Sequence, residues 1–247
     1  MIGENKGLVA FGVVLALGMI ITGSVVSKTY FKVKSSDNTI NVTGSAQKII
    51  ESDTARWNAN FNRTVGADQL KDGSVQIKKD LDAVTDYLIK NGVKKEQITI
   101  NPVTVYPNYE PSSNGYGSSG RVSGYNVSQQ ITVESNDVNN LTSIAQGSTS
   151  LLSQGIVFSS QPVEYYYSKL DDLKIEMLGA ATDNAKQRAQ TIAEKSGADL
   201  GGLKAASMGV FQITTVNSTE VSDYGFFDTS AIKKRITAVV RTTFSVK

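Results

Sequence analysis

The fold prediction starts from Asp53–Val65, with the sequence DTARWNANFNRTV. Its apolar residues alternate with polar ones, and they are Ala55, Trp57, Ala59, Phe61 and Val65. A period of two places successive side chains on opposite faces of a β-strand, so the stretch predicts a long strand with one buried face. We expect Trp57 and Phe61 to lie in the core, where large aromatic side chains on such a face usually pack.

Further strands and helices are predicted on either side of this strand in the sequence. A shorter strand is predicted at Thr39–Thr43, before Gly44. Apolar residues then recur at helical spacing from about Ala67 to Lys90, and Asn91-Gly92 supplies the left-handed residue that ends many helices. Further strands are expected near residues 97–105, 125–134, 156–167, 206–215 and 232–246, and further helices over about 138–153 and from Leu170 to Ser196-Gly197.

Prolines, glycines and alanines refine this prediction. Pro102 and Pro162 indicate edge or bent strands, because proline donates no hydrogen bond to a ladder. Residues 106–123 and 216–231 are rich in loop-forming residues, so we expect loops there, the first of them mobile. In the last helix the apolar stripe narrows to alanines, which lets a helix approach a sheet closely. The prediction is an α+β fold with a mixed, largely antiparallel sheet and helices on one face.

An apolar segment precedes this domain. Residues 7–26 read GLVAFGVVLALGMIITGSVV and carry no charge. At about 1.5 Å per residue, such a helix crosses a hydrocarbon core of about 30 Å. We therefore divide the chain into a flank (1–6), one N-terminal transmembrane anchor (7–27), a linker (28–38) and an α+β domain (39–247). Cleavage as a signal peptide stays open, because small residues occur at Val25–Ser27.

Composition excludes several classes of chemistry. The chain has no cysteine and no histidine, which excludes zinc sites built from these residues, thiol nucleophiles and Ser-His-Asp triads. Its net charge of +2 does not suggest a nucleic-acid partner. We expect no enzyme activity, no cofactor and no metal site.

Four segments, in this order, resemble the SIMPL-domain family of bacterial periplasmic or membrane-anchored proteins. They are Ile40–Gly44 (INVTG), Gly124–Val127 (GYNV), Ala185–Ala193 (AKQRAQTIA) followed by Gly197, and the alternating Ala238–Val246. The resemblance covers roughly residues 39–247. Two positions depart from the family pattern, with Asn184 in place of Asp and Gln190 in place of Glu. These two departures affect only the expectation of a charge pair on the helix that contains them.

The resemblance implies an extracytoplasmic subunit that forms homo-oligomeric rings or channel-like cages, and a link to envelope stress. It implies no catalytic residues. It conflicts with the charges around the anchor, because Lys28, Lys32 and Lys34 follow the anchor and only Lys6 precedes it, which weakly favours a cytoplasmic domain. We follow the resemblance and expect the domain on the periplasmic side of the inner membrane.

Two motifs have simpler explanations than ligand binding. Residues 115–120 (GYGSSG) match the dinucleotide pattern G-x-G-x-x-G, but such a motif must follow a strand and open a helix, and here a loop precedes it and a strand follows. Asp171, Asp172 and Glu176 lie at the start of a helix, where the helix dipole favours acidic residues.

Aromatic residues in the loops and at strand ends are candidates for subunit contacts, since aromatic side chains are enriched at interfaces. The predicted interface residues are Tyr106, Tyr109, Tyr166, Tyr224, Phe226 and Phe227. The first hypothesis is a non-enzymatic, membrane-anchored protein that assembles with itself into a closed ring or cage. The alternative is a monomeric or dimeric extracytoplasmic ligand-binding or sensor module, with a cleft beneath residues 106–123.

Overall fold

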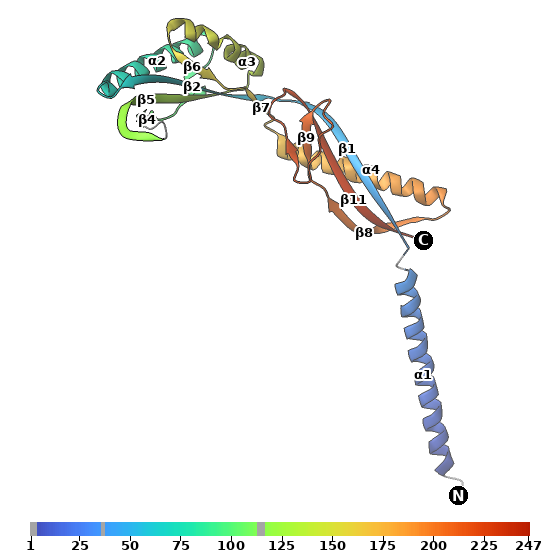
Figure 1. Cartoon of the computed structure of the whole chain (residues 1–247). Coiled ribbons are helices and arrows are strands. Elements are labelled where there is room, and N and C mark those ends of the chain that lie inside the picture. Colours follow the sequence, from blue (N-terminus) through green and yellow to red (C-terminus); the bar gives the residue numbers. More distant parts are fainter. Residues whose placement is uncertain (1–3, 36–37, 113–116) are drawn as a thin grey trace. The chain divides into compact units, whose positions relative to one another are not determined.

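The computed structural model describes residues 4–35, 38–112 and 117–247 (Figure 1). The chain divides into two compact units. Unit 1 comprises residues 1–46, 175–210 and 238–247, and unit 2 comprises residues 47–174 and 211–237. The helices are α1 (Glu4–Ser35), α2 (Leu70–Lys90), α3 (Val138–Gly147) and α4 (Leu170–Lys195), with 3-10 turns at Lys95–Gln97 and Ser148–Gln154.

The strands of the two units form two sheets. The first sheet contains β1 (Thr39–Glu51), β8 (Leu200–Met208), β9 (Gln212–Thr215), β10 (Phe226–Phe227) and β11 (Lys233–Val246). The second contains β2 (Thr54–Gly66), β3 (Ile98–Ile100), β4 (Thr104–Pro111), β5 (Ser118–Ser135), β6 (Val157–Ser160) and β7 (Glu164–Tyr166). The α+β class is confirmed, and the strands are divided between these two sheets.

Helix α1 contains the apolar segment. Val9–Tyr30 is long and apolar enough to cross a membrane, and none of it is buried within the described chain. The helix continues to Ser35 and so includes most of the residues predicted as a linker. An apolar helix with no protein packed around it fits a lipid-embedded anchor, because lipid then supplies the surroundings that a protein core would otherwise provide.

Unit 2 is built around β2, the strand predicted from the alternation. β2 pairs antiparallel with β5 on one side and with β6 and β7 on the other. Helices α2 and α3 pack against it. Trp57 and Phe61 are fully buried, as predicted, in a core with Ile77, Leu88 and residues of β5. Trp57 also donates from Nε1 to Ser160 Oγ at 2.9 Å, which satisfies its polar group inside the core.

The prediction of a mobile loop at residues 106–123 is wrong for the residues that the structure describes. Tyr106–Pro111 belongs to β4, and Ser118–Ser123 belongs to β5, and the two strands pair antiparallel. Residues 113–116 lie outside the described chain. Pro107 and Pro111 signalled a loop. Among the described strands, β4 pairs with β5 alone, and an edge strand tolerates proline because one side of its ladder is free.

A buried ion pair joins β2 to α2. Arg63 donates from Nε to Asp80 Oδ2 at 2.5 Å and from Nη2 to Asp80 Oδ1 at 2.7 Å. The Asp80 side chain is almost completely buried. The hydrogen bonds to Asp80 raise the pKa of the Arg63 guanidinium, so Arg63 keeps its charge within the fold. Both partners therefore matter for the packing of α2 on the sheet.

Unit 1 contains the part of the first sheet formed by residues 39–46 of β1, by β8 and by residues 238–246 of β11, and α4 covers this part, the unit 1 sheet. Val246 N donates to Asn38 O, which begins an antiparallel β1–β11 pair, and β8 is antiparallel to β11 on its other side. Along α4, Ala181, Ala185 and Ala189 form the alanine stripe that the sequence predicted, and all three are fully buried. Gly44 of β1 faces this stripe. A Cβ at Gly44 would lie 2.6 Å from Ala185 Cβ and still closer to the helix backbone, so only glycine permits this approach.

The remaining predicted elements differ in their limits. The expected strand at 206–215 is two strands, β8 and β9, and β8 begins earlier, at Leu200. The expected loop at 216–231 contains β10, which pairs parallel with β9 and makes the first sheet mixed. The expected helix at 138–153 is α3 followed by a 3-10 turn, which ends at Gly155 with a φ of 78°.

Candidate assembly surfaces

The predicted interface aromatics do not form one patch. Tyr106 and Tyr109 are exposed on β4, and Tyr224 is 97% exposed in the segment before β10. Phe226 and Phe227 form β10, and Tyr166 lies on β7. Of the six, the structure brings together Tyr166 and Phe227, whose rings stack with centroids 6.2 Å apart. Their role as subunit contacts stays a prediction.

Charged side chains surround the stacked pair. The Arg56 guanidinium lies 5.3 Å from the centre of the Tyr166 ring and donates to Glu134 Oε1 at 2.7 Å. Tyr166 donates from its hydroxyl to Glu164 Oε2 at 3.0 Å. Burial, followed by this hydrogen bond, raises the pKa of Tyr166. The Tyr166 ring therefore already has partners within one copy, and Tyr224 is the more available surface group.

Lys234 of β11 is the buried cation of unit 2. Its side chain is enclosed, Nζ donates to the backbone carbonyl of Tyr165, and the ammonium lies 5.5 Å from the centre of the Phe227 ring. Burial lowers the pKa of Lys234, and the nearby charge of Asp228 opposes this shift. Sequence reasoning missed this residue, because an alternating strand gives no sign of which lysine it buries. Its partners indicate a structural role.

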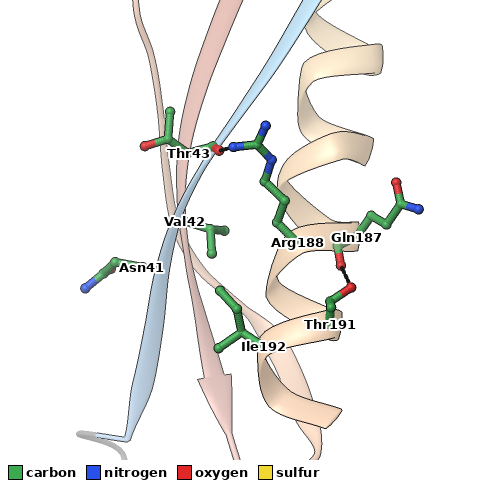
Figure 2. A pocket seen from close by; sticks show the side chains of 7 residues that line it. All are labelled: Asn41, Val42, Thr43, Gln187, Arg188, Thr191 and Ile192. Atoms are coloured by element: carbon green, nitrogen blue, oxygen red, sulfur yellow. Dashed lines mark hydrogen bonds between the residues drawn. The ribbon is translucent and has the colours of Figure 1, made fainter. Parts of the chain in front are cut away.

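Unit 1 contains a groove between β1 and α4 (Figure 2). Its volume is about 560 Å³. Figure 2 shows Val42 and Ile192 facing one another across it, from the strand and the helix respectively. The other lining residues are polar: Asn41, Thr43, Gln187, Arg188 and Thr191. An apolar floor with a polar rim beside a strand suits an extended polypeptide better than a compact small molecule.

One edge of β1 borders this groove. Arg188 donates from Nη1 to the carbonyl of Thr43 at 3.0 Å, and Ser45 N donates to Asn184 Oδ1 at 3.1 Å. These two side chains of α4 thus occupy the carbonyl of Thr43 and the N–H of Ser45 on the outward edge. Within the described chain no side chain of α4 is bonded to the edge before Thr43, so Thr39–Val42 is the open part of the edge. At position 184, asparagine accepts here as aspartate would.

A second hollow lies in unit 2. It has a volume of about 460 Å³ and is lined largely by hydroxyl and amide side chains, including Thr142, Ser160 and Gln161. Thr142 Oγ1 and the Tyr165 hydroxyl are hydrogen-bonded at 3.0 Å. The hollow lies beside α3 and Pro162, whereas the ligand-binding hypothesis placed a cleft beneath residues 106–123.

The acidic residues named in the sequence analysis are explained by their place at the start of a helix. Asp171 and Asp172 lie in the first turn of α4, and Lys174 donates to Asp171 at 3.0 Å. In the described ranges no three Asp or Glu residues cluster as a metal site would require. Asp53 accepts from the backbone and hydroxyl of Ser168. Burial raises the pKa of Asp53, but these bonds and one from Thr54 outweigh it, so the pKa lies below its usual value.

The comparisons with known proteins give one family. The model of the SIMPL family, described as a protein of unknown function (DUF541), matches residues 40–244. The match begins within β1 and ends within β11, so it includes the groove, both sheets and all six predicted interface aromatics. The comparison with curated proteins found no match.

Proposed function

Since the chain belongs to the SIMPL family, we propose that it is a non-enzymatic, membrane-anchored envelope protein that assembles with itself into a large closed homo-oligomer. The folded domain lies on the periplasmic side of the inner membrane, and the protein is linked to envelope stress, as the family resemblance implies. Lipid and further copies of the chain are its partners, and it needs no cofactor.

The observation that carries the assembly proposal is the pair of unpaired strand edges in the unit 1 sheet. Among the described residues, β1 and β8 each pair with β11 and with no second strand. Leu203 and Met208 of β8 are 53% and 56% exposed. Unpaired strand edges beside exposed apolar side chains favour association with another polypeptide, because pairing satisfies backbone groups and removes apolar surface from water together.

Helix α1 supports the anchor, and the family resemblance supports the periplasmic side. The lysines after the anchor are a small bias in the opposite direction, and such small biases do not fix orientation by themselves. A single anchor for each copy is compatible with a ring, since all copies then meet the membrane in the same orientation.

The test is the particle mass of the full-length chain, extracted gently in detergent and measured by mass photometry. We expect one species at many multiples of 26.5 kDa, after allowance for bound detergent. A monomer or dimer over the accessible concentration range would contradict assembly. That result would favour the ligand-binding module, with the hydroxyl-lined hollow beside α3 as its first candidate site.

A further inference from the structure

The two outer strands of the unit 1 sheet differ from the edges of the unit 2 sheet in how they are protected. Natural edge strands are usually blunted by proline or charge, which discourages pairing with other chains. In unit 2, β4 contains Pro107, Glu110 and Pro111, and Pro162 separates β6 from β7. In unit 1, residues 39–46 contain neither proline nor a charged residue, and β8 contains only Lys204.

The exposed apolar residues of β8 lie on the same face of the sheet as α4. Phe244 packs with Ala185 and Ala189 of α4, and it pairs directly with Leu203. Met208 pairs with Val240, which shares the inward face of β11 with Phe244. Directly paired residues in an antiparallel ladder share a face. Leu203 and Met208 therefore point to the helical side of the sheet, but α4 of the same copy leaves them exposed.

The groove at the other edge lies on that same face. It is bounded by α4, and Val42 and Ile192 form its apolar floor. Ile192 is 48% exposed, although it points toward the strand. One edge of the sheet thus carries uncovered apolar side chains, and the opposite edge carries a groove that accepts apolar side chains on the same face.

We propose that β8 of one copy pairs in parallel with the open Thr39–Val42 edge of β1 in the next copy, and that its apolar side chains enter the β1–α4 groove. β8 and β1 are each antiparallel to β11, so they run in the same direction, and a sheet continued from copy to copy joins them in parallel. The inference rests on the proposed assembly and names the junction that builds it.

This junction is heterologous, because one patch meets a different patch on the next copy. Such contacts produce a ring if the rotation from copy to copy closes, and a filament if it does not. Arg188 occupies the carbonyl of Thr43 and Asn184 occupies the N–H of Ser45, so in this junction the incoming strand stops before Thr43. The side-chain cover on β1 thereby sets the register, which an unprotected edge would leave free.

Engineered disulfides test the junction directly, because the chain contains no cysteine. One cysteine replaces Thr39 or Asn41, and another replaces Ala205 or Ser207, which gives four pairs that cover the neighbouring registers. Asn41 and Ala205 both neighbour Thr243, on opposite sides of β11. They are therefore about 10 Å apart in one copy, at about 4.8 Å between neighbouring strands, too far for an internal disulfide.

We expect at least one pair to give a ladder of covalent multimers on mild oxidation in detergent, whereas each single-cysteine variant stays at background. Mixing the two single-cysteine variants before assembly should give covalent dimers only. Absence of cross-linking above background for all four pairs, in particles that keep their large mass, would overturn the junction and leave the proposed function standing. Small particles throughout would contradict both.

A second test compares two exposed isoleucines of α4. Ile192→Lys places a charge on the groove floor, and we expect at least a tenfold rise in the concentration at which particles dissociate. Ile175→Lys is the matched control, because Ile175 is 73% exposed on the same helix and does not line the groove. Thermal unfolding confirms that both variants fold. Equal particle masses for the two variants would overturn the groove's part in the junction.

Discussion

At the scale of single residues, two ion pairs on β2 illustrate how burial decides what an ion pair contributes to the free energy of unfolding. Arg63 and Asp80 form a bidentate pair with the Asp80 side chain only 4% exposed. Arg56 and Glu134 are just as close, at 2.7 Å, but both side chains are about half exposed. Water screens the charges of the exposed Arg56–Glu134 pair. In the buried Arg63–Asp80 pair, water cannot replace a partner that is removed.

We therefore expect Asp80→Asn to lower the free energy of unfolding by about 3 kcal/mol, because it leaves the Arg63 charge without its counter-charge. Glu134→Gln should cost less than about 1 kcal/mol. Trp57 is the single tryptophan and is buried, so its fluorescence during urea unfolding of the full-length chain measures both values. Similar losses for the two variants would show that the buried pair contributes no more than the exposed one.

At the scale of elements, unit 1 depends on how closely a helix can approach a strand. The alanines of α4 leave little side-chain volume on the face toward the sheet, and Gly44 leaves none on the strand. The shortest residues thus occupy both sides of the contact. This explains the glycine in the Ile40–Gly44 segment by packing, because an extended strand does not otherwise need glycine.

Two glycine-to-alanine changes should have opposite signs. Gly44→Ala places a methyl group against the backbone of α4, and we expect a loss of about 3 kcal/mol, at the upper end for overpacked sites. Gly179→Ala lies on the exposed face of α4 with no atom near the new methyl group, and should stabilise by about 0.5–1 kcal/mol through helix propensity. Thermal unfolding followed by circular dichroism measures both. A neutral Gly44→Ala would mean that the helix moves away without cost.

At the scale of the whole molecule, the charges near the anchor and the family resemblance predict opposite sides of the membrane for the domain. Lys28, Lys32 and Lys34 favour a cytoplasmic domain, and the resemblance favours a periplasmic one. The absence of cysteine allows this conflict to be decided with a single introduced thiol.

Tyr224→Cys puts that thiol at a position in unit 2 that is 97% exposed within one copy. We expect a membrane-impermeant maleimide to label it in intact spheroplasts as fully as after lysis. The control variant Lys6→Cys has its thiol in the N-terminal flank, on the other side of the anchor, and should be labelled only after lysis. The reverse pattern would place the domain in the cytoplasm and contradict the localisation that we propose.

Several parts of the fold depend only on local order, and the sequence predicted them. Alternation identified β2 and β11, helical spacing identified α2 and α4, and Gly155 and Gly197 marked where helical segments end. The apolar N-terminal segment predicted the anchor helix, and four short segments predicted the family. These signals are strong because each reflects one periodic face or one backbone angle, which neighbouring residues specify.

Tertiary structure alone decided which strands meet. The β4–β5 hairpin resembled a loop in sequence because edge strands tolerate proline, and β8 gave little signal because most of its side chains are exposed on both faces. The burial of Lys234, the Tyr166–Phe227 stack and the β1–α4 groove all join residues far apart in the chain. Such contacts depend on which faces remain uncovered after packing, and no local period records that.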